Sequence, residues 1–156
     1  RRPVGERWDS GGSVSGPFDL NRFVAAQDAG GTYERALAEL RRGRKSSHWM
    51  WFVFPQYAGL GSSATSQHYA IGSLAEARAY LTHEVLGPRL RECAAAVLAA
   101  GAGSAEQIFG GIDAVKLRSS MTLFHRADPD EPVFQQVLER YFAGQPDTAT
   151  ERLLAD

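Results

Sequence analysis

A stripe of polar residues crosses an otherwise apolar segment, GIDAVKLRSSMTLFHRA, in the last third of the chain. Asp113, Lys116 and Ser120 stand at positions i, i+3 and i+7, which lie on one face of a helix, and Ser119 sits beside them. A desolvated lysine can act as a base toward a serine hydroxyl, so Asp113, Lys116 and Ser120 are the candidate catalytic residues. The alternative is that these groups only satisfy one another inside the protein.

A run of aromatic residues, HWMWFVFPQ at 48–56, is the second segment whose residues could take part in binding or catalysis. It has no polar face, so we expect it to be surrounded by protein. His48 and Gln56 bracket the run with polar groups, and the N–H of a tryptophan needs a partner when it is buried. The segment is therefore either a central buried helix or the floor of a pocket, in which Trp49 or Trp51 would stack on a ring.

A glycine- and serine-rich stretch, YAGLGSSATSQHYAIGS, follows the aromatic run. Gly59 and Gly61 free the backbone, and Ser62 and Ser63 come just before a predicted helix start. Backbone N–H groups and hydroxyls at a helix N-terminus favour an anion, which predicts a phosphate contact here. The stretch matches neither the P-loop nor the dinucleotide fingerprint, and the alternative is a surface loop that caps a helix.

The elements that must position these residues are helices. Helical spacing of apolar residues recurs along the chain, and no stretch alternates with period two for long enough to predict a sheet. Expected N-caps are Asp19, Thr32, Ser73 and Ser104, and Gly43 is an expected helix end. At 156 residues the chain predicts one compact all-α domain over 17–156, preceded by a flexible Gly/Ser/Arg-rich leader over 1–16.

Composition and charge limit the kinds of binding partner to expect and indicate the cellular compartment. A net charge of −1 argues against nucleic acid or a membrane surface as the main partner. No apolar run approaches the ~20 residues needed to span a bilayer. The single cysteine, Cys93, excludes an internal disulfide, fits a reducing compartment and is interpreted as a buried small hydrophobe, so we predict a cytoplasmic protein. The four histidines show no metal-ligand spacing, and neither a metal nor another cofactor is predicted.

The stretches GRKSSHWMWFVFPQYAGLGSS, HYAIGSLAEARAYLTHEVLGPRL and VKLRSSMTLF together resemble the family catalogued as domain of unknown function 1810. The resemblance runs from about Phe18 to Leu154. It implies a multihelical fold with two buried central helices, which we place at the Trp49 segment and at Asp113 to Phe124, and it implies no activity. The side chains expected in the core are Trp51, Phe54, Met121 and Phe124.

Two functions of different class fit these observations. The first is binding or processing of a small anionic, nucleotide-like metabolite, such as ADP-ribose or an NAD derivative, in a pocket between the two central segments. An enzyme that hydrolyses glycosidic bonds would suit these candidate residues. The predicted ligand-binding residues are His48, Trp49, Trp51, Gln56, Gly59, Gly61, Ser62, Ser63 and Ser119. The second is a non-enzymatic ligand-sensing or protein-interaction module, in which the aromatic run is core; metal catalysis ranks third.

Overall fold

The structure, a computed structural model, describes residues 16–155. Over this range the prediction of an all-α domain is confirmed, and the one extended pairing is an isolated bridge between Tyr57 and Ile71. The leader predicted over 1–16 lies, apart from Gly16, outside the described residues. The elements are η1 (Gly16–Phe18), α1 (Asn21–Asp28), η2 (Ala29–Gly31), α2 (Thr32–Arg42), α3 (Met50–Val53), α4 (Ala64–His68), α5 (Leu74–Thr82), α6 (Leu86–Ala99), α7 (Ala105–Ala127), α8 (Pro132–Phe142) and α9 (Thr148–Ala155).

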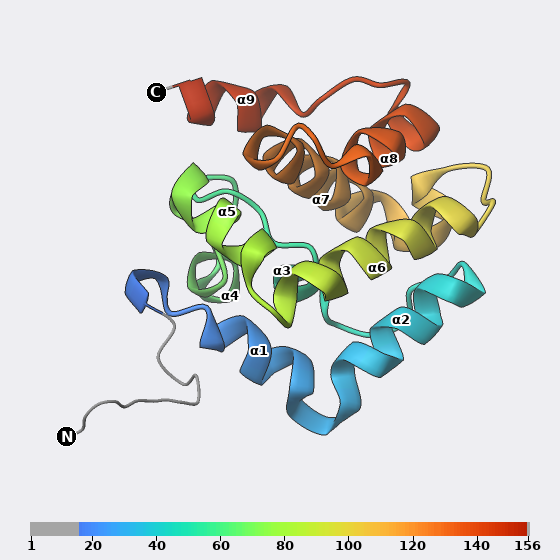
Figure 1. Cartoon of the computed structure of the whole chain (residues 1–156). Helices are drawn as coiled ribbons and strands as arrows, with labels where there is room; N and C mark the ends of the chain where they lie inside the picture. Colours follow the sequence, from blue (N-terminus) through green and yellow to red (C-terminus); the bar gives the residue numbers. More distant parts are fainter. Residues whose placement is uncertain (1–15, 156) are drawn as a thin grey trace.

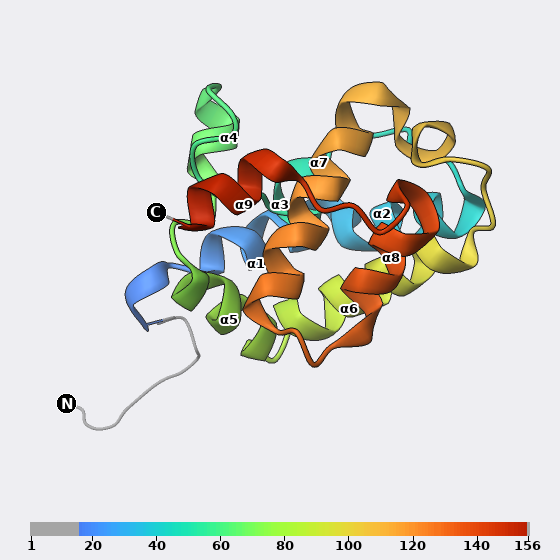
Figure 2. The same ribbon diagram turned by 90° about the horizontal axis from the view of Figure 1, so that it is seen from above.

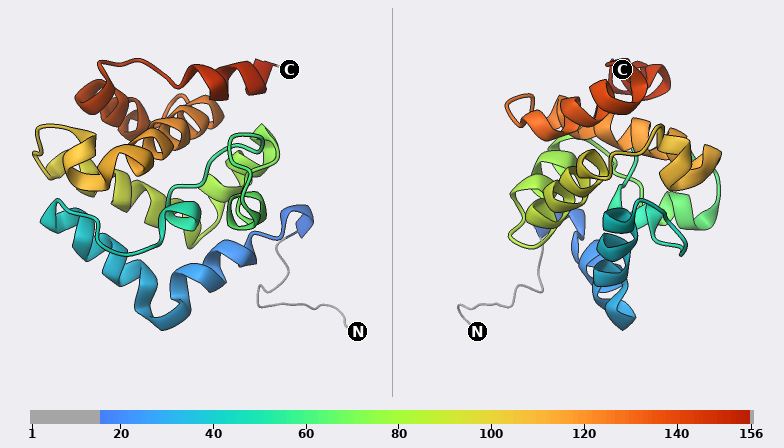
Figure 3. Two further views of the ribbon diagram at one scale, coloured as in Figure 1. Left: turned by 180° about the vertical axis from the view of Figure 1, so that it is seen from behind. Right: turned by 90° about the vertical axis from the view of Figure 1, so that its right-hand side faces the viewer.

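The helices pack around α7. This helix contacts α5, α8 and α9, while α6 contacts α2, α5 and α8. In Figure 1, α1 and α2 form a V along one side of the molecule, and α8 and α9 cover the opposite side. The view from above shows α4 standing out from the body near the C-terminal end of the chain (Figure 2). From behind, the chain leaves α2 and crosses this face through α3 toward α4 (Figure 3).

The predicted helix over Asp113 to Phe124 is confirmed as a buried central helix. It belongs to the longer α7, which also includes the short helix expected from Ser104 onward. The two parts meet at a kink, where Gly110 has φ +80° and ψ 170°. Glycine tolerates this backbone conformation because it has no Cβ. The buried side chains after the kink include Ala114, Leu117, Met121, Leu123 and Phe124.

The aromatic run forms a much shorter helix than expected. α3 is a single turn of four residues, and it ends before Pro55, which disfavours helical conformation in the residue preceding it. Trp49 and Phe54 are fully buried, so one side of the turn belongs to the core. Trp51 is only half-buried on the other side. The expectation that Trp51 is largely buried in the core is therefore met only in part: it lies at the edge of the core, because an all-apolar run does not reveal which side of a single turn faces inward.

Several predicted helix ends are confirmed, and two are wrong. The side chains of Ser73 and Ser104 accept the backbone N–H three residues further on, at 3.0 and 3.2 Å. Gly43 ends α2 with φ +80°. Asp19 does not cap α1, because the helix begins two residues later and no side chain caps it. Thr32 lies inside the first turn of α2, where its hydroxyl donates to a carbonyl of the preceding turn.

Two further predictions, on the cysteine and on membrane-spanning segments, can be compared with the structure. Cys93 is fully buried in α6, and burial raises the pKa of its thiol to about 12. This confirms its interpretation as a small core residue. Among the helices between residues 16 and 155, none has the length and apolar character to cross a membrane.

His83 caps the start of α6, which the sequence analysis did not anticipate. Its Nδ1 accepts hydrogen bonds from the backbone N–H groups of Val85 (3.1 Å) and Leu86 (3.2 Å). We expect His83→Ala to lower the free energy of unfolding by about 1 kcal/mol, since side-chain caps contribute on that order. Urea unfolding followed by circular dichroism measures the effect. The matched control His48→Ala changes an exposed histidine, and equal stability of the two variants would contradict the capping role.

Candidate functional site

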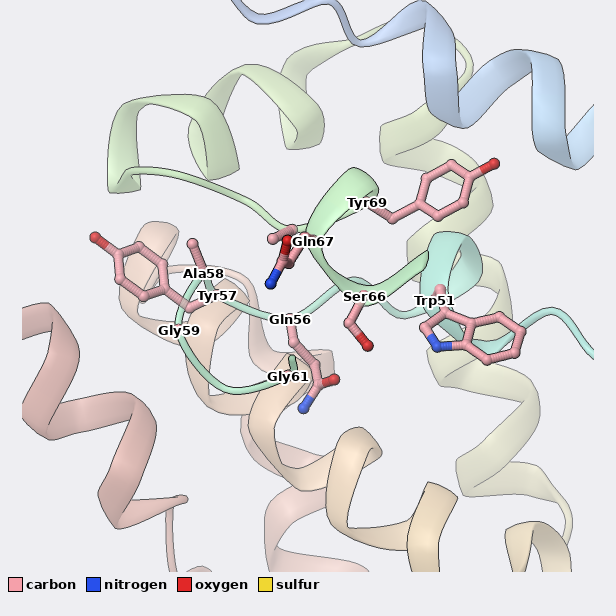
Figure 4. Close-up of a pocket in the computed structure, with 10 residues that line it drawn as sticks. Trp51, Gln56, Tyr57, Ala58, Gly59, Gly61, Ser66, Gln67 and Tyr69 are labelled. Atoms are coloured by element: carbon pink, nitrogen blue, oxygen red, sulfur yellow. The ribbon is translucent and has the colours of Figure 1, made fainter. Parts of the chain in front are cut away.

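A pocket of about 110 Å³ lies between the end of α3, the loop that follows it, and α4 (Figure 4). Four of the predicted ligand-binding residues line it: Trp51, Gln56, Gly59 and Gly61. Ser66 also lines it and was not among the predicted ligand-binding residues. α7 contributes no lining residue, so the prediction of a pocket directly between the two central segments is wrong in position. The wall opposite α3 is α4, the helix whose start was predicted just after Ser62 and Ser63.

Polar atoms from three side chains face the middle of this pocket. Figure 4 shows the nitrogen-bearing edge of the Trp51 indole, the hydroxyl of Ser66 and the amide of Gln56 turned toward the same space. Among the described residues, neither the Trp51 indole N–H nor the Gln56 amide has a hydrogen-bond partner. Every residue that lines the pocket is uncharged. The site therefore offers hydrogen-bond donors and acceptors beside an aromatic ring, without a charge of its own.

Backbone pairing fixes the loop that carries Gln56. The N–H of Ile71 donates to the carbonyl of Gln56 at 2.9 Å, and the N–H of Ala58 donates to the carbonyl of Ile71 at 2.8 Å. These bonds belong to the isolated bridge between the two segments. Because the main chain is held at Gln56 itself and at Ala58, the Gln56 amide is presented to the pocket from a fixed position.

Arg22 of α1 holds the far wall of the pocket. Its guanidinium donates to the carbonyls of His68 (2.8 Å) and Ala70 (2.9 Å), which end α4, and to the carboxylate of Glu76 in α5 (2.8 Å). Two more bonds reach the carbonyls of Phe18 and Asp19, in the turn before α1. The arginine side chain is 13% exposed, so most of it is shielded from water. One residue thus ties α1, α4 and α5 together behind the pocket.

The glycine-serine loop uses its own polar groups to build α4. Ser63 caps the helix, accepting from the N–H of Ser66 at 3.1 Å, and the two hydroxyls lie 2.8 Å apart. The carbonyl of Ser62 accepts from Gln67 at 3.1 Å. A Cβ on Gly61 would lie 2.6 Å from that of Ser66, so this glycine is required for close packing. The alternative of a capping loop thus has direct structural support, and phosphate binding by Ser62 and Ser63 stays a prediction.

A cluster of two lysines and one aspartate lies next to the pocket. Lys45 pairs with Asp113 at 2.9 Å, and Lys116 approaches the other oxygen of the same carboxylate at 3.6 Å. Each ammonium group also lies over a tryptophan ring: Lys45 is 5.0 Å from the centroid of Trp49, and Lys116 is 5.1 Å from that of Trp51. Both lysines contact the same carboxylate, and Lys116 is the more loosely held of the two at the edge of the pocket.

The loop that carries Lys45 is anchored by a buried carboxylate that the sequence analysis missed. Glu39 is 3% exposed and accepts hydrogen bonds from the N–H groups of Ser46 (2.8 Å) and Ser47 (3.1 Å) and from the indole N–H of Trp49 (2.9 Å). The hydroxyl of Ser47 donates to it as well. Burial alone would raise the pKa of Glu39, but these hydrogen bonds outweigh it and lower the pKa to about 2. The only indication of this role in the sequence is that Glu39 lies on an otherwise apolar face of α2.

The remaining predicted site residues do not join the pocket. Trp49 is fully buried and bonded to Glu39, so it is unavailable for stacking on a ligand. Ser120 is also fully buried, and its hydroxyl has no partner among the described residues. Ser119 is 2% exposed and donates to the carbonyl of Val115. His48 is exposed beside the aromatic run. The structure therefore brings Asp113 and Lys116 together but does not assemble the predicted Ser–Lys pair.

Metal ligands do not gather in the part of the chain that the structure describes. Between residues 16 and 155, no three His, Cys, Asp or Glu side chains come close enough to hold an ion. The sequence-based prediction of no metal and no cofactor stays a prediction.

The all-helical fold, with its kinked central helix and short aromatic turn, defines the class of protein. The chain belongs to the family described as "Protein of unknown function (DUF1810)", which matches residues 17–154. It is similar to the conserved hypothetical protein Rv1873 of Mycobacterium tuberculosis, whose crystal structure is known. The two chains are 52% identical with a TM-score of 0.86, over 90% of this chain and 99% of that one. No curated protein matches the chain. The resemblance seen in the sequence is confirmed, and it brings no reaction with it.

Proposed function

We propose that this protein binds a small anionic, nucleotide-like metabolite, of the ADP-ribose or NAD-derived kind, at the pocket beside Trp51 and Gln56. The observation that carries the proposal is the loosely paired, partly exposed ammonium group of Lys116 at the edge of a pocket with an aromatic ring and an amide. A ligand with a ring and a phosphate matches both parts of this arrangement.

Lys116 is the group that supports anion binding most directly. Asp113 is held more closely by Lys45, at 2.9 Å, than by Lys116, at 3.6 Å. An ammonium group carries three donors, so Lys116 keeps capacity for a further acceptor. Its side chain is 22% exposed, and it can reach solvent next to Trp51. A phosphate oxygen at this position would form a charge-assisted hydrogen bond, which is about twice as strong as a neutral one.

The pocket itself supports binding of only part of such a ligand. Its volume of about 110 Å³ is below the 300–1,000 Å³ typical of sites that enclose whole ligands. A single nucleobase or sugar is the appropriate size, and the rest of the molecule would extend across the neighbouring surface.

The geometry supports binding better than catalysis. Ser120 is buried, so a substrate cannot reach its hydroxyl in this conformation. Asp113 is engaged by two lysines, which makes it a charge-balancing group for the cluster. We therefore do not extend the proposal to hydrolysis of a glycosidic bond.

Substitution of Lys116 tests the proposal. ADP-ribose, NAD and AMP should raise the melting temperature of the wild-type protein in a concentration-dependent way, since a ligand at 100 times its Kd stabilises the folded state by about 2.7 kcal/mol. Lys116→Met keeps the aliphatic stem and removes the charge. We expect it to weaken binding at least about tenfold, because a charge-assisted hydrogen bond contributes about 1.5–3 kcal/mol.

Two comparisons make this result specific. Arg126→Met removes one exposed positive charge from the same helix and should leave binding unchanged. Lys116→Arg keeps the charge and should retain binding. Ligand-induced stabilisation that persists in Lys116→Met would contradict the proposal. A large loss of unliganded stability in both Lys116 variants would show that the lysine is structural.

An interaction module is the second candidate, and one observation favours it. Ile112 and Val115 on α7 are 77% and 58% exposed, and they are the exposed large hydrophobic residues in the described part of the chain. Apolar side chains that share one helix face in water are a common feature of protein-binding surfaces. A melting temperature that no ligand of the panel changes would favour this second function.

A further inference from the structure

Building on the proposed function, we infer that the pocket receives the nucleobase of a nucleoside phosphate and that the phosphate stays outside it, at Lys116. Gln56 is then the residue that determines specificity, through its contact with the edge of the base. The ligand class becomes nucleoside phosphates, with sugar phosphates and free phosphate as poor ligands.

The charge distribution sets this orientation. All the lining residues of the pocket are uncharged, whereas Lys116 and Lys45 lie outside it, against the tryptophan rings. A phosphate enclosed by uncharged groups would lose its hydration without a counter-charge, which is strongly unfavourable. The hydroxyl of Ser63 and the carbonyl of Ser62 are occupied within the loop and α4. The uncharged end of the ligand therefore enters the pocket.

The hydrogen-bonding groups of the pocket suit the edge of a base. The Gln56 amide presents an acceptor and a donor side by side, and no described residue occupies either of them. A glutamine amide forms paired hydrogen bonds with an adenine edge in this way. The Trp51 indole N–H adds a donor and the Ser66 hydroxyl adds a group that can donate or accept, both turned toward the same space (Figure 4). A sugar could satisfy some of these groups, but it would leave the planar amide pair less well matched.

The position of Trp51 links the two ends of the ligand. This residue lines the pocket and at the same time carries the Lys116 ammonium over its ring, 5.1 Å from the centroid. A ligand whose base lies in the pocket therefore has a cation one indole ring away. Among the described residues, no aromatic side chain pairs with Trp51. Base and phosphate thus have separate partners, which can be removed one at a time.

A matrix of three probes and three proteins tests the orientation. The probes are AMP, adenosine and ribose 5-phosphate, and the proteins are the wild type, Gln56→Leu and Lys116→Met, with affinities measured by isothermal titration calorimetry. We expect Gln56→Leu to weaken AMP and adenosine by a similar factor, about tenfold, and to leave ribose 5-phosphate unchanged. Lys116→Met should weaken AMP and ribose 5-phosphate and leave adenosine unchanged. Gln136→Leu, at an exposed glutamine of α8 that does not line the pocket, is the matched control for Gln56.

The possible outcomes separate this inference from the proposed function. If ribose 5-phosphate binds the wild type as tightly as AMP, the pocket does not read the base and the inference is wrong, although anion binding stands. If ribose 5-phosphate loses affinity in Gln56→Leu but not in Lys116→Met, the phosphate lies in the pocket, and both the inference and the assignment of the anion to Lys116 are wrong. If none of the three probes binds the wild type, the proposed function fails and the inference fails with it. Circular dichroism melts of the variants show whether each one folds.

Discussion

Replacing Trp49 with alanine is expected to lower the free energy of unfolding by about 4 kcal/mol, as large-to-small changes at buried aromatic positions do. Trp49 is fully buried and packs edge-on against Phe109 and obliquely against Phe54. Its indole N–H also donates to the buried carboxylate of Glu39 at 2.9 Å. The alanine variant therefore loses core packing and leaves part of a buried charge without its partner. Urea unfolding monitored by circular dichroism gives the difference.

The neighbouring tryptophan provides the control. Trp51→Ala removes a half-buried side chain and one cation–π contact, so we expect a loss of about 1 kcal/mol. Trp49→Phe keeps most of the packing and loses only the N–H, which should place it between the two alanine variants. If Trp51→Ala proved as costly as Trp49→Ala, the assignment of the inward-facing side of α3 would be wrong.

Replacing Glu39 with glutamine is expected to lower the free energy of unfolding by about 3 kcal/mol at pH 7, because hydrogen bonds to a charged group contribute about 1.5–3 kcal/mol each and are only partly regained by an amide. Glu39 accepts from two backbone N–H groups, the Ser47 hydroxyl and Trp49. In the glutamine variant, the side-chain NH2 group would face some of the N–H and O–H groups that donate to the carboxylate in the wild type. Glu34→Gln, at an exposed position in the same helix, is the control and should change stability by less than about 0.5 kcal/mol.

The effect of Glu39 depends on pH in a defined direction. The pKa of this carboxyl is about 2 in the folded protein, below its ordinary value of 4.5. A group whose pKa is lowered by folding stabilises the protein fully above its unfolded pKa, and the contribution is lost as the pH falls through the folded pKa. The stability gap between wild type and Glu39→Gln should therefore shrink between pH 5 and pH 2. A gap that stays constant over this range would contradict the lowered pKa.

Local signals predicted most of the fold. Ser73 and Ser104 each stand three residues before the helix position whose N–H they accept, and Gly43 takes a backbone conformation that other residues rarely adopt. These features depend only on neighbouring residues, so the sequence contains them. Asp19 fails as a cap because its backbone, with φ +48°, belongs to the turn before α1, where Arg22 holds the chain.

The candidate site was predicted less completely, because it depends on contacts between distant segments. Lys45 stands in a basic stretch that is typical of a solvated helix end. It nevertheless pairs with Asp113, 68 residues further along the chain. Ser66 lines the pocket because α4 folds back onto Gly61, and nothing in its immediate sequence distinguishes it from the other serines. Trp49 and Trp51 differ only in which side of a single turn they occupy, and an uninterrupted apolar run gives no period from which to decide.

The hydrogen bonds of Arg22 have a consequence for how fast a ligand enters and leaves. Widening the pocket at α4 would pull the carbonyls of His68 and Ala70 away from the guanidinium, which also holds Glu76 and the turn before α1. The opening motion is then shared by three helices and cannot be a local fluctuation of a five-residue helix. Access is therefore expected to be slow compared with the opening of an ordinary surface loop, and both the association and the dissociation rate constant should rise when this arginine is shortened to lysine.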